Sequence, residues 1–324
     1  MKILTLSIAG YNVEKYIRQT LDSICCKNIS KLEVFVVDDG GKDKTLDIAK
    51  EYSEKYPGSI IPVHKENGGW GSTVNYSIAH ATGKYFKLLD GDDLFTTENL
   101  DRFIEYLESV DADVIYTPYF RFDDESGKRL KNFNISDQFN KNIAYSLRET
   151  EIEKGLEMHA LSFRTAVLQD NNVRVLEKCF YTDNEYRMKG LAYSQSIIFT
   201  NIELYNYRVG REGQSVDITG LKKHYLDAIR VSKEMMSFYK SNETLTFDYL
   251  TKCVKNSIDF VCWTLIALNK KEELQEYDNY IKQNGNLFYD THIIPFKVLR
   301  TFNFNGLGIV RYLIEKISII KKSI

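Results

Sequence analysis

Two hydrophobic periods alternate along the first 120 residues, and this alternation constrains the fold more than any other feature of the sequence. Short apolar runs such as residues 32–37 predict strands, whereas apolar residues three and four positions apart, as in 14–24, predict helices. Alternating strands and helices with short connections form a mostly parallel sheet flanked by helices. The sequence therefore predicts an α/β fold of the Rossmann-like kind. The predicted strands are 3–8, 32–37, 60–63, 85–89 and 114–117, and the predicted helices are 14–24, 43–56, 72–81 and 98–107.

The pattern changes further along the chain. Residues 120–150 are polar and irregular, which indicates a hairpin or an insertion, and residues 197–209 are strand-like again. After residue 222 the apolar spacing is helical. We therefore expect an α/β domain over residues 1–222 and a C-terminal helical region over 223–324. The predicted helices of that region are 224–239, 247–268, 271–283 and 308–322.

Charge and cysteine content exclude several classes of protein. The chain has 43 basic and 45 acidic residues, a net charge of −2, which does not favour a nucleic-acid partner. Its five cysteines include no CxxC pair, so neither a zinc site nor a disulfide framework is predicted. The N-terminus lacks the features of a signal peptide, and no apolar stretch reaches the roughly 18 residues that span a membrane. We expect a cytoplasmic protein.

Polar residues and glycines recur where the predicted strands end. They are Tyr11-Asn12, Asp38-Asp39-Gly40-Gly41 and Asp90-Gly91-Asp92-Asp93. In a parallel sheet these ends meet at one edge, where ligands of α/β proteins bind. The sequence therefore predicts a ligand site at this edge.

The three carboxylates of the Asp90–Asp93 segment repel one another unless a cation neutralises them. Hard divalent ions such as Mg²⁺ or Mn²⁺ take such oxygen ligands together with substrate phosphates. Gly91 allows a close approach of the backbone to a ligand. The alternative is a solvated acidic turn.

Two further segments suit a nucleotide. Asp38 can accept a hydrogen bond from a base N–H, and Asp39 can accept one from a ribose hydroxyl; the alternative role, capping the next helix, suits Asp43. The loop at residues 65–72 places Gly69 and Ser72 at the start of a helix, where a diphosphate binds favourably. A plain loop followed by a helix cap explains that segment equally well.

Together these segments resemble the family 2 glycosyltransferases of the GT-A fold. Residues 11–17 resemble the family's YNxxxYL segment, 36–41 its VDDGS, 67–75 its NGGxxxARN and 83–93 its GxYxxxLDxDD. The resemblance implies inverting transfer of a hexose from a nucleoside diphosphate sugar, often UDP-linked, to a saccharide or lipid-linked acceptor. The donor-binding residues that it implies are Ala9, Tyr11, Asn12, Asp38, Asp39, Gly69, Ser72, Asn75, Asp90, Gly91 and Asp92.

Within this set, the resemblance assigns the base and ribose to Ala9, Tyr11 and Asp38. It assigns a divalent metal, Mn²⁺ or Mg²⁺, to Asp92 with Asp90. Two positions depart from the family pattern: Ala9 replaces a proline, and Val74 replaces an arginine that often helps to hold the donor. These departures leave the identity of the sugar donor open.

An inverting transfer needs a base for the acceptor hydroxyl. The segment 181–186 resembles the region that carries the family's ED pair, with Thr182 in place of the glutamate, which makes Asp183 the expected base and Glu185 its rival. Asp183 can also cap the helix that follows.

Other residues are weaker candidates. His159 either lines the acceptor site or has a structural role. Residues 207–216 resemble the family's loop over the donor diphosphate, in which Arg208 and Arg211 suit phosphate and Gln214 lies nearby; a glycine-bearing surface loop is the alternative.

The last predicted helix is basic and amphipathic, which suits the surface of a membrane, although docking on the core or on a second subunit is the alternative. Two other functions compete with a glycosyltransferase. A nucleotidyltransferase would carry a basic glycine-rich loop after its first strand, and residues 9–12 do not resemble one. A non-catalytic nucleotide-sugar-binding module would not require the intact acidic motif and Asp183.

Overall fold

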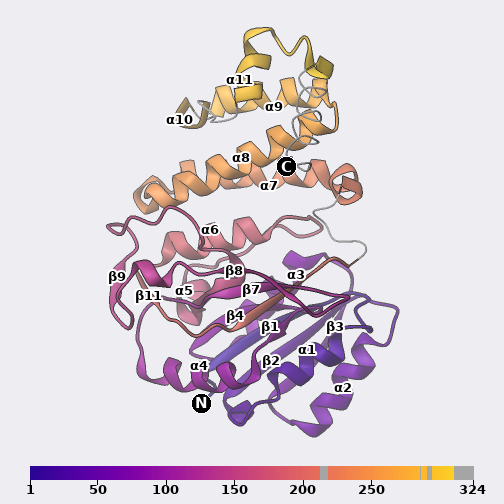
Figure 1. Cartoon of the computed structure of the whole chain (residues 1–324), viewed down its shortest axis with the longest axis vertical. Helices are drawn as coiled ribbons and strands as arrows, with labels where there is room; N and C mark the ends of the chain where they lie inside the picture. The colour runs from indigo at the N-terminus through magenta and orange to yellow at the C-terminus, as the bar shows by residue number, and fades with distance from the viewer. Residues whose placement is uncertain (212–217, 285, 290–293, 310–324) are drawn as a thin grey trace. The chain divides into compact units, whose positions relative to one another are not determined.

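The computed structural model describes residues 1–211, 218–284, 286–289 and 294–309, and the chain divides into two compact units, Met1–Glu212 and Gly213–Ile324 (Figure 1). The sequence placed this boundary at residue 222. Each unit is described separately below.

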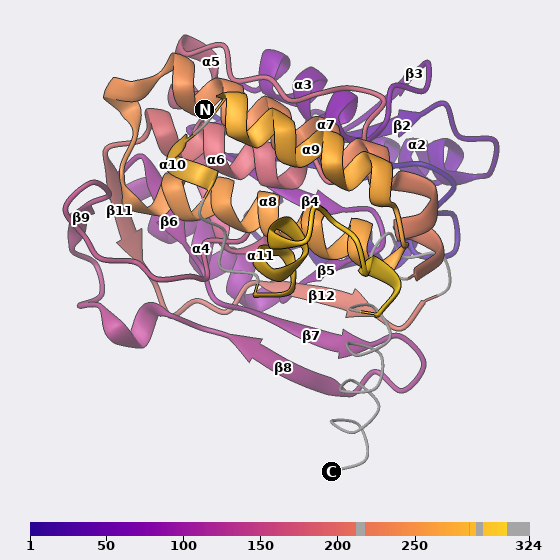
Figure 2. The same ribbon diagram turned by 90° about the horizontal axis from the view of Figure 1, so that it is seen from above.

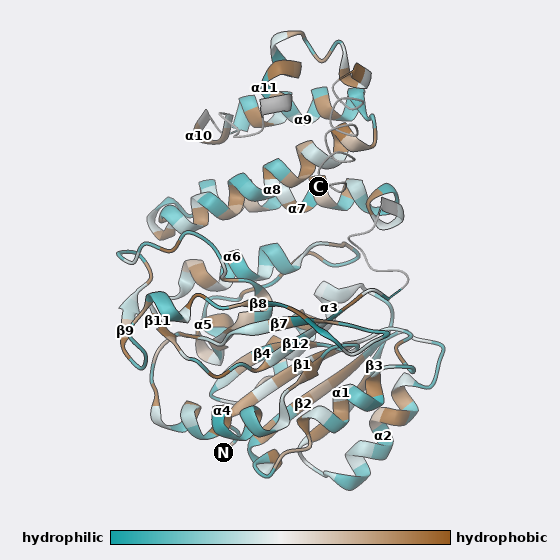
Figure 3. Cartoon of the chain, viewed as in Figure 1, coloured by the Kyte–Doolittle hydropathy of each residue, from teal (hydrophilic) through white to brown (hydrophobic). Residues whose placement is uncertain are grey.

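Four parallel strands form the first half of the main sheet. They follow the order β3-β2-β1-β4, with every connection a crossover through a helix. β1 and β2 are buried along nearly their whole length, which is why their sequences are continuous apolar runs (Figure 3). The α/β fold is therefore confirmed. The four strands are β1 (Leu4–Gly10), β2 (Leu32–Asp39), β3 (Ile60–Lys65) and β4 (Tyr85–Asp90).

The second half of the sheet is mixed. β10 (Leu161–Arg164) lies antiparallel between β4 and β6 (Val114–Tyr116), and β11 (Ser196–Phe199) pairs in parallel with β6. β9 (Ala144–Ser146) closes this edge. The sequence did not predict β10 or β9, whose partners in the sheet lie far away along the chain.

A smaller sheet lies beside the main one, in the order β5-β12-β7-β8. β7 (Tyr119–Asp123) and β8 (Arg129–Phe133) form a hairpin, and β12 (Tyr205–Val209) pairs in parallel with β7 (Figure 2). β5 (Leu94–Phe95) directly follows the acidic segment. The strand-like run 197–209 is thus two strands, β11 and β12, in two different sheets.

Helices cover both faces of the main sheet (Figure 1). The helices pack on the sheet through apolar faces such as that of α1, where Ile17, Leu21 and Ile24 are buried. The first group is α1 (Ile17–Ile24), α2 (Thr45–Lys55) and α4 (Thr97–Ser109), and the second is α3 (Trp70–His80), α5 (Thr165–Asp170) and α6 (Asp183–Tyr193). Short 3-10 turns η1 (Ile29–Lys31), η2 (Ser136–Gln138) and η3 (Met158–Ala160) complete the first unit.

The described part of the second unit is helical, as the sequence predicted. The long helix α7 is interrupted by non-helical backbone at His224. No helix among the described residues is both long enough and apolar enough to span a bilayer. Most of the predicted amphipathic tail lies outside the described residues. The elements are α7 (Ile218–Ser241), η4 (Glu243–Leu245), α8 (Asp248–Ala267), α9 (Lys271–Asn284), α10 (Asn286–Tyr289) and α11 (Ile294–Thr301).

Candidate donor and catalytic site

The register of the parallel strands brings the predicted ligand residues to one edge of the sheet. Ala9 of β1 lies beside Asp90 of β4, and Gly10 lies beside Asp38 of β2. Asp38 in turn lies beside His64 of β3. Residues as far apart in sequence as Ala9 and Asp90 thus share one row at the carboxyl ends of the strands.

Asp38 is buried and points toward the next strand. One carboxylate oxygen lies 2.6 Å from Nδ1 of His64, and the other accepts a hydrogen bond from the N–H of Gly41 at 3.0 Å. His64 was not among the site residues predicted from the sequence. Its exposed ring and the Asp38 carboxylate together offer polar groups that suit a base or a ribose.

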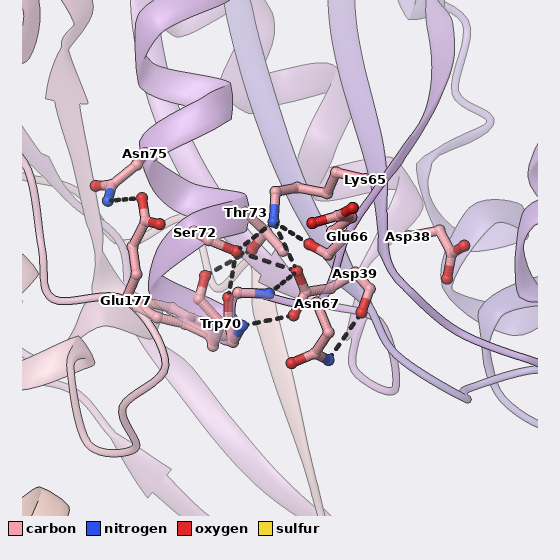
Figure 4. Close-up of polar contacts among 12 residues, drawn as sticks. Asp38, Asp39, Lys65, Glu66, Asn67, Trp70, Ser72, Thr73, Asn75 and Glu177 are labelled. Carbon is pink, nitrogen blue, oxygen red and sulfur yellow. Dashed lines mark hydrogen bonds and ion pairs between the residues drawn. The ribbon is translucent and has the colours of Figure 1, made fainter.

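Asp39 makes a different set of contacts, with residues between the end of β3 and the first turn of α3 (Figure 4). Its carboxylate accepts hydrogen bonds from the N–H groups of Gly68 and Gly69 at 2.9 and 2.7 Å. It also accepts bonds from Nζ of Lys65 at 2.9 Å and from Oγ of Ser72 at 3.1 Å. Asp39 is buried, so these bonds fix the loop to the end of β2.

This arrangement changes the role that the sequence suggested for the start of α3. The sequence predicted a diphosphate at this helix N-terminus, bound near Gly69 and Ser72. In the structure, an internal anion, the Asp39 carboxylate, binds the backbone N–H groups just before the helix. Gly69 also has a positive φ of 79°, which a residue with a side chain rarely adopts.

Asn75 links α3 to a distant segment rather than facing the sheet edge. Its amide donates to the carbonyl of Val175 at 2.9 Å and to the carboxylate of Glu177 at 3.0 Å (Figure 4). Its own oxygen accepts from the N–H of Val175 at 2.9 Å. Because Asn75 is buried, it positions the chain that leads into α6.

Asp90 is the carboxylate of the acidic segment that lies at the end of β4. Its Oδ1 accepts a hydrogen bond from the indole of Trp70 at 2.9 Å, a contact that the sequence did not suggest. Burial, reinforced by the charge of Asp92, raises the pKa of Asp90 to about 7. The repulsion expected within the acidic segment is therefore present, and it favours a cation at this position.

Asp92 and Asp93 have different surroundings. Asp92 forms an ion pair with Arg211, which lies after β12. Asp93 is fully buried; its oxygens accept from the hydroxyl of Tyr205 at 2.6 Å and from the N–H of Arg208 at 2.7 Å. Asp93 thus fastens the acidic segment to β12.

Gly91 packs against the protein. A Cβ added there would lie 2.6 Å from the carbonyl oxygen of Ala9, and the Gly91 carbonyl accepts a bond from Thr20 at 3.0 Å. The glycine therefore permits the acidic segment to pack on the end of β1, which is not the close approach to a ligand that the sequence suggested.

Arg208 is buried, and its guanidinium is bound within the protein. It donates to the Asp92 carbonyl at 2.6 Å, to Asp124 at 2.6 Å and to Gln19 at 2.8 Å. The bond to the Asp92 carbonyl holds the acidic segment against β12. Arg211, in contrast, pairs with the side chain of Asp92, one of the predicted donor-site residues.

His159, in η3, lies against the acidic segment. Its ring packs among three tyrosines, with Tyr205 at 4.8 Å and Tyr207 at 4.6 Å between centroids. Burial lowers the pKa of His159 to about 3, so the imidazole is neutral. Ligand atoms of Asp90, Asp93 and His159 lie within 4.8 Å of one another, a grouping that differs from the predicted pair Asp90 and Asp92.

Asp183 and Glu185, the two candidate bases, have different surroundings. Asp183 opens α6, and its charge is one of the contributions that raise the pKa of Asp90, after burial and the charge of Asp92. Burial raises the pKa of Asp183, while the Arg187 guanidinium opposes that shift. Glu185 is buried, accepts from the N–H of Leu176 at 2.9 Å and pairs with Lys189 at 2.6 Å.

The remaining predicted residues lie on the periphery. Tyr11 is exposed, and Asn12, with a φ of 54°, accepts a hydrogen bond from the N–H of Lys42 at 2.9 Å. This bond joins the loops after β1 and β2. Gln214 lies outside the described residues.

A mostly parallel sheet with a carboxylate cluster at its carboxyl edge, extended by a small second sheet, defines the GT-A class of fold. The sequence pattern described as "Glycosyl transferase family 2" matches residues 6–172, about half of the chain. The chain therefore belongs to glycosyl transferase family 2.

Curated relatives and solved structures agree with this assignment. The chain is 29% identical over 284 residues to "Minor teichoic acid biosynthesis protein GgaB" of Bacillus subtilis, an alignment that covers 83% of this chain and 30% of GgaB. It is 26% identical over 223 residues to "Poly(ribitol-phosphate) beta-N-acetylglucosaminyltransferase TarS" of Staphylococcus aureus, covering 66% of this chain and 37% of TarS. The chain thus spans about a third of the length of each of these two relatives.

The crystal structure of residues 1–349 of S. aureus TarS, in complex with UDP-GlcNAc, has the same fold. It superposes with a TM-score of 0.70 at 20% identity, covering 98% of this chain and 92% of that one. The GT-A architecture with a C-terminal helical region is therefore confirmed.

Proposed function

We propose that this chain transfers a hexose from a UDP-linked sugar to a saccharide or lipid-linked acceptor, with inversion at the anomeric carbon and with Asp183 as the general base. The single observation that carries this proposal is that Asp183, at the start of α6, is close enough to Asp90 at the end of β4 for its charge to contribute to the raised pKa of Asp90. A base and an acidic segment that are far apart in sequence lie together where a donor would bind.

The proposed reaction is a single displacement. The acceptor hydroxyl oxygen attacks the anomeric carbon while its proton passes to the Asp183 carboxylate. The bond between that carbon and the diphosphate oxygen breaks, and the nucleoside diphosphate leaves with the electron pair. The raised pKa of Asp183 suits this role, because a base works best when its pKa approaches the working pH.

The donor assignment draws on the same edge of the sheet. Asp38 and His64 offer polar groups for the base or ribose, and the TarS structure was determined with UDP-GlcNAc. Arg211 forms an ion pair with Asp92 of the acidic segment, and its guanidinium suits the charge of a diphosphate.

A divalent metal, Mn²⁺ or Mg²⁺, fits the acidic segment. The raised pKa of Asp90 reflects unbalanced negative charge at this position. Asp90 and Asp92 would hold the ion, because both oxygens of Asp93 are bound to Tyr205 and Arg208. When bound, such an ion would act as a Lewis acid toward the departing diphosphate.

The names of GgaB and TarS refer to teichoic acid and to poly(ribitol phosphate). We extend to this chain the idea that the acceptor belongs to a surface polymer.

The test compares D183N with wild type and with D170N, an exposed control at the end of α5. We expect D183N to lower the rate of UDP release from UDP-GlcNAc in the presence of acceptor by about 10²- to 10⁴-fold. Thermal stabilisation by UDP with Mn²⁺ should be unchanged, since Asp183 is assigned to the proton and not to the donor. Equal rates for D183N and D170N would refute the assignment of the base.

A further inference from the structure

One face of the second sheet carries aromatic rings and cations, and it begins at the acidic segment. The hydroxyl of Tyr205 donates to Asp93 at 2.6 Å and lies 3.2 Å from the backbone nitrogen of Asp90. Tyr207, two residues along β12, therefore faces the same side of the sheet. We call this the β12–β7–β8 face; its members are Tyr205, Tyr207, Tyr119, Arg121, Lys131 and Phe133.

The rings of this face are in mutual contact. His159 lies over Tyr207 with centroids 4.6 Å apart and over Tyr119 at 5.1 Å. Tyr119 stacks on Phe133 at 4.6 Å with an interplanar angle of 4°. A continuous aromatic floor thus leads away from the acidic segment.

Two cations lie on this floor. The guanidinium of Arg121 is 4.9 Å from the centroid of Phe133 and 5.5 Å from that of Tyr207, and Nζ of Lys131 is 5.0 Å from Phe133. Both side chains are exposed. Within the described ranges, neither has a carboxylate partner. Arg129, also on β8, does have one, since it pairs with Glu203.

An irregularity in the hairpin sorts these cations onto opposite faces. The register shifts between Arg121 and Phe122, so Lys131 lies opposite Arg121 whereas Arg129 lies opposite Phe122. Arg129 accordingly stacks on Phe120, 4.2 Å from its centroid, on the other side of the sheet. Without the shift, Arg129 would lie opposite Asp123, on the side that bears His159; the shift moves Arg129 to the other side and leaves Arg121 and Lys131 opposite each other.

We propose that Arg121 and Lys131 bind a phosphate group of the acceptor, so that the acceptor is a phosphate-bearing polyol or saccharide whose neighbouring hydroxyl faces Asp183. This inference rests on the proposed function and names the acceptor class for the same site.

The chemistry of the face fits such a ligand. A guanidinium and an ammonium form charge-assisted hydrogen bonds with phosphate oxygens, and the half-buried rings of Tyr207 and Phe133 can pack against the C–H groups of a polyol or sugar, whereas Tyr119 and Tyr205 are buried. Arg121 lies beside Tyr207, which is two residues from Tyr205. The cations are thus roughly 7 Å along the strand and roughly 5 Å across from the acidic segment, about the span between a hydroxyl and the next phosphate of a polyol phosphate.

The cations also have an alternative explanation as stabilising cation–π pairs. Such pairs need no ligand and contribute about 0.5–1 kcal/mol at exposed sites. That alternative predicts a change of stability on mutation, without any change in acceptor affinity, and the experiment below separates the two.

The experiment measures binding of a fluorescent poly(ribitol phosphate) oligomer to the whole chain, with neutral dextran of similar length for comparison. We expect R121Q/K131Q to weaken binding of the phosphate oligomer by at least roughly tenfold, since two charge-assisted contacts are lost. R129Q, the matched control from the opposite face, should bind like wild type. R121K/K131R keeps both charges and should retain most of the affinity.

Equal affinities of R121Q/K131Q and R129Q for the oligomer would overturn the proposal, as would equal binding of the oligomer and dextran to wild type. Vesicles containing phosphatidylglycerol form a third arm: if the double substitution reduces vesicle binding but leaves oligomer binding unchanged, the face binds lipid phosphate and the acceptor assignment is wrong. Hydrolysis of UDP-GlcNAc without acceptor reports on the donor site alone. Its absence in wild type would count against the proposed function, while the oligomer result would still be readable.

Discussion

At the scale of single residues, Asp39 shows how a carboxylate at a ligand-binding edge can belong to the scaffold. It accepts hydrogen bonds from two backbone N–H groups, one lysine and one serine, which lie between the end of β3 and the first turn of α3. Asp38, the preceding residue, directs its carboxylate to His64 instead. Successive side chains of a strand point to opposite faces, so adjacent aspartates reach different partners.

Replacing Asp39 should therefore destabilise the first unit. In D39N, one oxygen becomes an NH₂ group that cannot accept a hydrogen bond, and the neutral amide no longer forms an ion pair with Lys65. We expect the free energy of unfolding to fall by about 2–4 kcal/mol, measured by urea denaturation. D47N, an exposed substitution on α2, serves as the control and should change it by less than about 0.5 kcal/mol. A D39N protein as stable as D47N would contradict the structural role of Asp39.

Lys87 is a second buried charge, in the middle of β4. Its Nζ donates to the carbonyls of His159 and Leu161 at 2.8 and 3.2 Å, and burial lowers its pKa to about 7. The unfolded chain holds this proton up to its ordinary pKa of 10.5. Between these values the unfolded state binds more protons than the folded state, so stability rises with pH.

The K87M protein should lose this dependence. For wild type we expect Lys87 to contribute up to about 1.4 kcal/mol per pH unit to the free energy of unfolding between about pH 7.5 and about pH 9. Urea titrations across that range should give a shallower slope for K87M, whereas K50M, on the exposed side of α2, should keep the wild-type slope. Identical slopes in all three proteins would show that Lys87 keeps its charge when folded.

At the scale of elements, the site depends on a connection between α3 and α6 that spans about 100 residues of sequence. Asn75 of α3 exchanges two hydrogen bonds with the backbone of Val175 and a third with Glu177. A few residues later the chain enters α6 at Asp183. The position of the proposed base thus depends on a residue that the sequence assigned to the donor.

N75A should affect both stability and activity. Removing the amide leaves a backbone N–H and a carbonyl of Val175 buried without their partner, which we expect to cost about 2–4 kcal/mol. Limited proteolysis should cleave residues 174–182 faster than in wild type. N171A, an exposed change whose amide bonds only to Val167 of its own helix, is the matched control. Equal cleavage rates in N75A and N171A would refute this link.

The elements also show what could be predicted from the sequence. β1 to β4 and their helices were predictable because buried parallel strands are continuous apolar runs and helices repeat every 3.6 residues. The meeting of Asp38 and Asp90 followed from that topology. β10 was not predictable, because its partners, β4 and β6, are distant in sequence. The contacts of Trp70, His64 and Asn75 depend on side-chain direction, which a motif does not specify.

At the scale of the whole molecule, the near-neutral net charge conceals an uneven distribution. Residues 310–324 contain four basic side chains and one acidic one, and the chain as a whole has a net charge of −2. In the structure Arg300 donates to Asp278 and to the carbonyl of Tyr289, so it belongs to the interior of the second unit.

These facts define where a test of membrane binding should cut the chain. Phe304 and Leu307 are buried in the second unit, and Lys271 bonds to Asn305 at 2.9 Å, so a chain that ends earlier would disturb that unit. A chain that ends at Ile309, an exposed residue, keeps these contacts and lacks residues 310–324. If the tail binds a membrane surface, the full chain should float with vesicles rich in phosphatidylglycerol, and the shortened chain should stay in solution.

A charge substitution separates the two forces that such binding would use. Changing Arg311, Lys316, Lys321 and Lys322 to glutamine keeps the apolar residues and removes the attraction to anionic lipid, which is worth about 1 kcal/mol per basic residue near the surface. We expect this variant to lose most of its flotation on anionic vesicles, and raised salt to weaken wild type in the same direction. Equal flotation of the full, shortened and substituted chains would refute membrane binding by the tail. Because UDP-GlcNAc hydrolysis without acceptor does not require a membrane, it should be equal in all three proteins.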